Sequence, residues 1–219
     1  MATRARSAAV SVVVEAGARR VFASALEWPG WSRSARDEAG AVQALAAYAS
    51  RYAPVTRAAH VRFPAHPAFQ VVERVAGNAT TDFGAPGIVA SAEHAPLTAA
   101  EARRFVALLR ACWATLDGVT ATAPAALRKG PRGGGRDRDT VLAHVLGSEA
   151  GYARTIGVRL REPAFDDPSA IAAAREAITQ AVRAARPVEG RGWPLRYAVR
   201  RIAWHVLDHA WEIEDRSEA

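Results

Sequence analysis

The sequence of 219 residues contains one cysteine, one lysine and no long uninterrupted apolar run. The single cysteine, Cys112, cannot form an internal disulfide, so a reducing, cytoplasmic location is expected. No apolar stretch approaches the roughly 18 residues of a membrane-spanning helix, which argues against an integral membrane protein. Half of the residues are hydrophobic and 23% are charged, a composition that excludes wholesale disorder and favours a folded globular protein.

Basic residues outnumber acidic ones by 29 to 22, and all but one of them are arginine. A net charge of +7 is compatible with nucleic-acid binding. However, the segment from Arg128 to Arg138 holds five basic residues and one acidic residue, and so carries four of these seven charges. The arginine and alanine bias is also typical of a GC-rich genome, such as that of an actinobacterium. Overall basicity is therefore a weak indicator of the ligand.

The first part of the chain, residues 8–95, predicts a small mixed α/β domain with a linker. Val12, Val13 and Val14 favour a first strand over a targeting segment. Glycine and proline residues between 80 and 96 predict a loop and linker. The expected order is strand, strand, helix, strand. The second strand is expected at residues 18–28, the helix from 37 to about 52, where Pro54 ends it, and the last strand at 69–75.

From residue 97 to 216 the apolar residues recur with a helical period. Thr98 and Glu101 form a capping-box pattern at the start of the first helix. Further helices are expected from about 139 to 156, from Pro168 to before Pro187, and from Pro194 to about 215. Four amphipathic helices of this length predict a four-helix bundle. The fold class expected for the whole chain is therefore α+β.

The last helix carries two histidines, His205 and His209, spaced so that both rings lie on one face. Two apolar stripes flank a polar sector that contains Arg201, His205, Asp208 and Glu212. A helix that is apolar on two sides is expected to pack on two sides. Buried polar groups without partners are unfavourable, so this sector predicts an internal metal or ligand.

His144 is expected to point inward, because it shares a helix face with Val141, Val145 and Tyr152. Together with His205 and His209 it would form a divalent metal site with open coordination positions, for zinc or for nickel, iron or manganese. Asp208 and Glu212 are the candidate catalytic residues: they would orient the rings or accept protons, and Glu212 is also a candidate direct ligand. The alternative is three core histidines bonded to backbone and carboxylate groups.

Two segments carry a resemblance to a known family: AspThrValLeuAlaHisValLeuGlySerGluAlaGlyTyr around His144, and TrpHisValLeuAspHisAlaTrpGlu around His205 and His209. Over residues 98–215 the chain resembles the DinB-like (DinB/YfiT) superfamily of putative metalloenzymes. The resemblance implies a four-helix bundle whose metal triad falls on these three histidines. It also implies a metal-dependent enzyme acting on a small molecule.

Relatives in this superfamily include thiol S-transferases and a mycothiol-dependent maleylpyruvate isomerase. The resemblance therefore implies a low-molecular-weight thiol such as mycothiol as co-substrate. The isomerase has glutamate in place of one C-terminal histidine, and this departure argues against transferring its substrate. Residues 21–52, with the turn that contains Trp28 and Trp31, resemble the HicB-like fold over a short stretch. These two tryptophans are expected in the core, or alternatively on a partner surface.

The glycine-rich loop from Lys129 to Arg136 is not a P-loop, since it lacks the Gly-Lys-Ser/Thr ending. Its glycines, its position before a helix and its arginines are suited to an anion. Arg132, Gly134 and Arg136 are therefore the candidate residues for binding the polar tail of a thiol cofactor. The alternatives are a solvated connection, or a non-catalytic module that binds protein or nucleic acid through this loop. The remaining histidines are expected at the surface, and a homodimer is possible.

Overall fold

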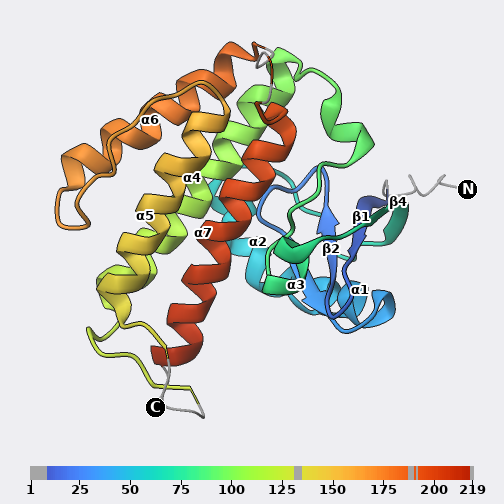
Figure 1. The fold of residues 1–219 in the computed structure, drawn as a ribbon, viewed down its shortest axis with the longest axis horizontal. Helices are drawn as coiled ribbons and strands as arrows, with labels where there is room; N and C mark the ends of the chain where they lie inside the picture. Colours follow the sequence, from blue (N-terminus) through green and yellow to red (C-terminus); the bar gives the residue numbers. More distant parts are fainter. Residues whose placement is uncertain (1–8, 131–134, 187–189, 191, 218–219) are drawn as a thin grey trace, which may run out of the picture.

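The computed structural model describes residues 9–130, 135–186, 190 and 192–217. The chain is α+β, as predicted, and 55% helical (Figure 1). Its strands are β1 Val10–Ala16, β2 Val21–Ala25, β3 Ser32–Ala35 and β4 Phe69–Ala76. Its helices are α1 Glu38–Ala47, α2 Ala49–Ala58, α3 Ala79–Phe83, the short 3-10 helix η1 Ser91–His94, α4 Ala99–Thr122, α5 Arg138–Thr155, α6 Pro168–Ala184 and α7 Leu195–Ser217.

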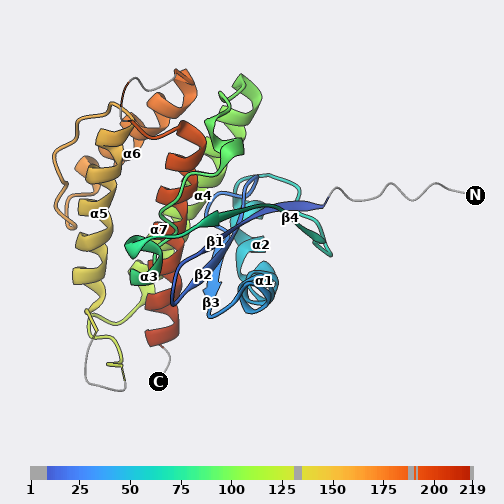
Figure 2. The same ribbon diagram turned by 45° about the vertical axis from the view of Figure 1, so that its right-hand side comes forward.

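The four strands form one sheet in the order β3-β2-β1-β4. β2 runs antiparallel to both neighbours, whereas β1 and β4 are parallel, so α1 and α2 form the crossover between them. The sheet lies between α1 on one side and α7 on the other (Figure 2). β2 occupies only the centre of the predicted segment 18–28. β3 was not predicted, because its sequence Ser-Arg-Ser-Ala lacks β-branched and aromatic residues.

The predicted helix that ends at Pro54 is wrong in two respects. The chain forms two helices that meet at Tyr48, and α2 continues through Pro54 to Ala58. A proline inside a helix costs about 3 kcal/mol. Full burial of Tyr52 and Val55, which flank the proline, offsets this cost.

The four C-terminal helices begin and end close to their predicted limits. Thr98 and Glu101 form the expected capping box, and Pro168 occupies the first turn of α6. α7 packs against α4 and α5, while α6 packs against the same two helices. Nearly every α7 residue from Tyr197 to Ile213 is buried, which confirms packing on two sides.

One hydrophobic cluster extends from β1 and β2 into α4, α5, α6 and α7. Trp31 is fully buried in it, donates a hydrogen bond from Nε1 to the carbonyl of Leu45 at 2.9 Å, and stacks on Tyr52. Trp28 packs edge-on against the same tyrosine. Both tryptophans are therefore core residues, as expected. Of the helices that the structure describes, none has the length and apolarity needed to cross a membrane.

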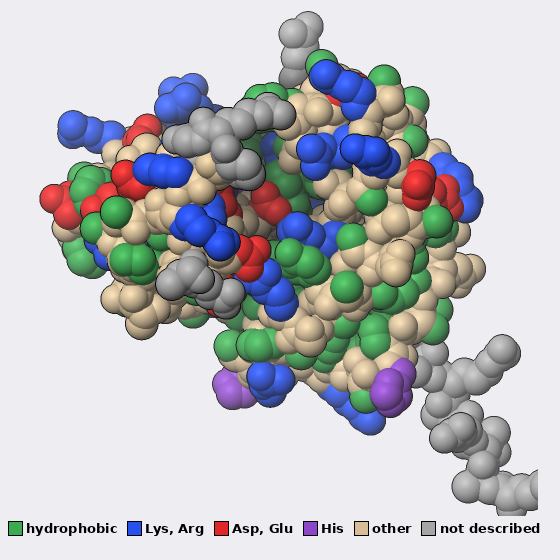
Figure 3. Space-filling view, turned by 90° about the horizontal axis from the view of Figure 1, so that it is seen from below, with side chains coloured by type: hydrophobic (Ala, Val, Ile, Leu, Met, Phe, Trp, Pro, Cys, Tyr) green, Lys and Arg blue, Asp and Glu red, His purple; other side chains and the backbone are tan. Residues whose placement is uncertain are grey.

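Charged side chains of both signs are interspersed on the face seen from below (Figure 3). A hollow separates two lobes of this face, and basic as well as acidic side chains lie at its rim. Three of the basic loop residues are engaged within the chain: Lys129 pairs with Asp137, Arg138 pairs with Asp139, and Arg128 donates to the carbonyl of Asp215.

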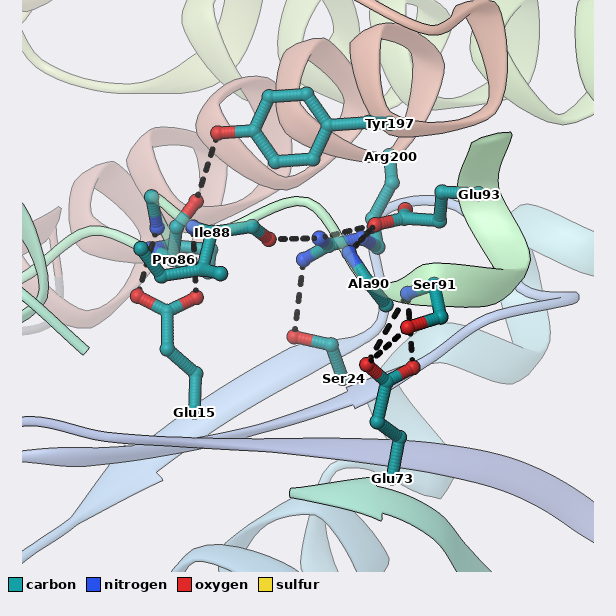
Figure 4. A network of polar contacts seen from close by, with 11 residues as sticks. Glu15, Ser24, Glu73, Pro86, Ile88, Ala90, Ser91, Glu93, Tyr197 and Arg200 are labelled. Atoms are coloured by element: carbon teal, nitrogen blue, oxygen red, sulfur yellow. Dashed lines mark hydrogen bonds and ion pairs between the residues drawn. The ribbon is translucent and has the colours of Figure 1, made fainter. Parts of the chain in front are cut away.

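The segment between β4 and α4 is not a plain linker. It contains α3 and η1, and it is held between the sheet and α7 by buried polar contacts (Figure 4). Arg200 of α7 donates to Glu93 at 2.6 and 2.9 Å and to the carbonyl of Ile88 at 3.0 Å. Glu15 of β1 accepts from the backbone of Gly87 and Ile88. The glycine and proline content of this segment predicted a loop. Ion pairs and helix-capping contacts instead hold the segment in a defined structure.

Candidate metal centre

Three imidazoles converge between α5 and α7, and they are the three that the sequence predicted. His144 comes from α5, and His205 and His209 come from successive turns of α7. One ring nitrogen of each lies within 4.8 Å of the others. The Nε2 atoms of His144 and His205 are 3.2 Å apart. Two nitrogen ligands on one tetrahedral zinc ion lie about 3.4 Å apart, given zinc–nitrogen distances of about 2.05 Å. The cluster can therefore hold one metal ion.

The two helices run antiparallel past this cluster. His144 lies beside both α7 histidines, with ring centroids 5.1 Å from His205 and 5.0 Å from His209. Tyr152, two turns later on α5, contacts only the earlier of the two, with its ring 5.6 Å from His205. Tyr152 thus extends the row of side chains between α5 and α7 beyond the histidines.

The histidines differ in depth. His205 and His209 are buried, with exposed fractions of 6% and 9%, whereas His144 is exposed. His144 is therefore not a buried residue, although its ring points to the two buried histidines of α7, as predicted. Val141 and Val145, which share its helix face, are completely buried. As a consequence one side of the cluster is open to solvent, as a catalytic rather than a structural metal site requires.

Glu212 orients one of the rings. Its Oε2 accepts a hydrogen bond from Nδ1 of His209 at 2.7 Å, and its Oε1 pairs with Arg216 at 2.8 Å. This bond leaves Nε2 of His209 free to bind a metal, which is the usual carboxylate–histidine–metal arrangement. The hydrogen bond from His209 is also the main cause that lowers the pKa of Glu212. Both oxygens are engaged, which suits an orienting role better than direct ligation.

Asp208 has a different neighbour. Its Oδ1 pairs with Nη1 of Arg33 on β3 at 3.0 Å, so it links α7 to the sheet. Burial raises the pKa of Asp208, and the guanidinium of Arg33 opposes this rise. Of the two predicted carboxylates, Glu212 is the one that contacts a histidine ring in the described part of the chain.

The surroundings of His144 and His205 favour the neutral form of these two imidazoles. Burial, followed by the charges of His209 and Arg201, holds the pKa of His205 well below its usual value. Burial, followed by the charge of Arg136, lowers the pKa of His144. A neutral imidazole is the form that binds a metal, so these pKa shifts favour ligation at neutral pH. Nδ1 of His205 is buried without a hydrogen-bond partner among the described residues, which leaves an unused polar atom at the cluster.

Of the three residues predicted to bind an anion, one lies in the described part of the chain. Arg132 and Gly134 lie outside the described residues. Arg136 precedes α5, and its charge contributes to the lowered pKa values of His144, His205 and Glu212. Along the chain it lies on the other side of His144 from Tyr152.

Helical spacing placed Tyr152 on the face of His144 and Arg201 in the polar sector of α7, but it did not identify Trp193 as a neighbour of the site. The ring of Tyr152 lies 5.6 Å from that of His205 and 5.4 Å from that of Trp193, and these two rings form an aromatic wall. Spacing also did not show that Arg201 would have no ion pair among the described residues. The loop histidines His60, His66 and His94 are exposed, as expected.

The cluster therefore combines three imidazoles, one carboxylate that orients a ring, and one side open to solvent. Such a set resembles metal sites that keep coordination positions for water or a substrate. Comparison of the chain with protein-family models, with curated proteins and with solved structures finds no match.

Proposed function

We propose that the protein is a metal-dependent enzyme of the DinB-like superfamily, with α4 to α7 as its four-helix bundle. His144, His205 and His209 would hold one divalent ion, and the substrate would be a small molecule acted on with a low-molecular-weight thiol. One observation carries this proposal: three ring nitrogens from two helices lie within 4.8 Å of one another. The sequence segments around these histidines add the family resemblance.

The donor set fits zinc best. Three imidazole ligands suit zinc, and also nickel and iron, better than magnesium or calcium, which prefer oxygen ligands. When bound, the ion would lower the pKa of a thiol or water in its open position. In this proposal Glu212 is a positioning residue that fixes the ring of His209, and Asp208 is the candidate proton acceptor. Arg136 would bind the anionic tail of the thiol.

Elemental analysis of the purified full chain tests the metal site. We expect about one equivalent of metal in the wild type and a loss of most of it in the double variant His144→Ala/His209→Ala. The double variant His66→Ala/His94→Ala removes two exposed histidines far from the cluster in sequence and is the matched control. Wild-type metal content in the first variant would remove the proposed site.

A thermal-shift screen of the metal-loaded protein tests the thiol. We expect mycothiol to raise the melting temperature of the wild type and to lose this effect after Arg136→Met. An interaction module that binds nucleic acid predicts another outcome: salt-sensitive binding of RNA or DNA that a chelator does not change. The internal contacts of Arg128, Lys129 and Arg138 favour the metal-enzyme proposal over this alternative.

A further inference from the structure

Arg201 is a buried arginine without an ion pair in the described part of the chain. Its exposed fraction is 7%, and its Nη1 is buried with no hydrogen-bond partner among the described residues. Its neighbour Arg200 is buried too, but donates to Glu93, Ile88 and Ser24. Buried charges are normally paired, because an unpaired charge in the interior is unfavourable. Among the described residues, no acidic side chain pairs with Arg201.

Arg201 faces the same space as the candidate metal centre. It lies one helical turn before His205, so the two side chains share a face of α7. Its guanidinium carbon is 5.3 Å from the ring centre of Tyr152 on α5, and that ring in turn contacts His205. Arg136 precedes α5, so along the chain it lies on the other side of His144 from Tyr152.

Two aromatic rings hold the guanidinium in place. Besides Tyr152, the ring of Trp204 lies 4.7 Å from the guanidinium carbon. Aromatic contacts stabilise the flat faces of a guanidinium, while its N–H groups remain available in its plane. A rigid guanidinium with an unused N–H edge is well suited to a planar oxyanion.

We propose that Arg201 binds a carboxylate of the small-molecule substrate in the space between α5 and α7, beside the histidine cluster. That the bound molecule is a substrate rests on the proposed function. A single guanidinium matches the single charge of a carboxylate. The aromatic wall of Tyr152 and Trp193 would contact the apolar body of the same molecule. The substrate class is therefore a small carboxylic acid with an apolar body.

Benzoate is the probe that tests this site, and benzamide is its neutral counterpart of nearly the same shape. Binding to the full chain is measured by calorimetry and by tryptophan fluorescence, since Trp193 and Trp204 flank the site. The variants are Arg201→Met, which removes the charge, and Arg201→Lys, which keeps it. Arg103→Met on α4 changes an exposed arginine and is the matched control.

We expect the wild type and Arg103→Met to bind benzoate, with benzamide weaker by about tenfold or more. Arg201→Met should lose benzoate binding by a similar factor, and Arg201→Lys should retain part of it. Unchanged benzoate binding by Arg201→Met, or no benzoate binding by the wild type, would overturn the proposal. Tighter binding of inorganic phosphate than of benzoate would overturn the assignment to a carboxylate.

Two further readouts separate this site from other roles. An arginine with a structural role lowers the melting temperature when it is replaced, whereas removal of an unpaired buried charge should leave that temperature unchanged or raise it. A lower melting temperature for Arg201→Met would thus contradict the proposal. Metal content should stay at the wild-type level in Arg201→Met. A wild-type protein that binds benzoate through Arg201 but contains no metal would refute the proposed function alone.

Discussion

Buried polar and charged groups on the two sides of α7 differ in how completely they are paired among the described residues. On the side of the sheet, Arg200 is completely paired with Glu93 and the carbonyl of Ile88. On the side of α5, Arg201 has no ion pair in the described chain, and Nδ1 of His205 has no hydrogen-bond partner there. Complete pairing is typical of contacts that hold a fold together. Incomplete pairing beside a metal-capable cluster indicates a surface built for a ligand.

The largest effect is expected where pairing is complete. Glu93→Gln would leave the guanidinium of Arg200 buried without its counter-charge, and we expect the free energy of unfolding to fall by about 3–5 kcal/mol. Urea unfolding measures this loss. Glu38→Gln breaks the exposed pair with Arg74 and should change stability little. Metal content should not change in either folded variant, because neither pair includes a residue of the histidine cluster.

Glu149 of α5 is a buried acid that faces α4 rather than α7. Its carboxylate accepts a hydrogen bond from Nε1 of Trp113, yet burial raises its pKa to about 7. Because the folded state then binds the proton more tightly, stability should decrease as pH rises from about 4.5 to 7 and level off above. The full decrease corresponds to about 3 kcal/mol.

Glu149→Gln should remove this decrease, since the amide keeps the shape and a hydrogen-bond acceptor but carries no charge. Urea unfolding at pH 5 and at pH 8 provides the measurement. The variant should gain stability over the wild type mainly at pH 8. An equal difference at both pH values would show that the carboxyl does not titrate in this range.

Metal binding should stabilise the α5 side of α7. At a free zinc concentration of 100 times the dissociation constant, the wild type should gain about 2.7 kcal/mol in unfolding free energy. A chelator should abolish this gain, and His205→Ala should lack it. The double variant His66→Ala/His94→Ala should keep it, because both histidines are exposed. An equal gain in His205→Ala would contradict binding at the cluster.

A smaller effect is expected from the carboxylate that orients His209. Glu212→Gln should weaken metal binding about 10- to 100-fold, measured by competition with a chelating dye. Glu214→Gln, two residues along the same helix, loses only a pair with Arg51 and is the control. If both variants bind metal as tightly as the wild type, Glu212 has no positioning role.

Much of the helical part and of the site followed from local patterns. The spacing of His205 and His209 on an amphipathic helix was enough to place both rings on one face, and the capping box of Thr98 and Glu101 marked the start of α4. Local patterns failed where contacts distant in sequence decided the structure. Examples are the path of α2 through Pro54 and the folded segment between β4 and α4.

The sequence by itself determined that α7 would be buried on two sides and would carry two ring nitrogens along one stripe, because helical geometry fixes neighbours three and four residues apart. Only the tertiary structure decided that His144 would meet them from the solvent side. It also decided that Arg200 would pair with Glu93, while Arg201 has no counter-charge among the described residues. Partners such as Glu93 lie more than a hundred residues away in sequence, and their meeting depends on how helices and sheet pack.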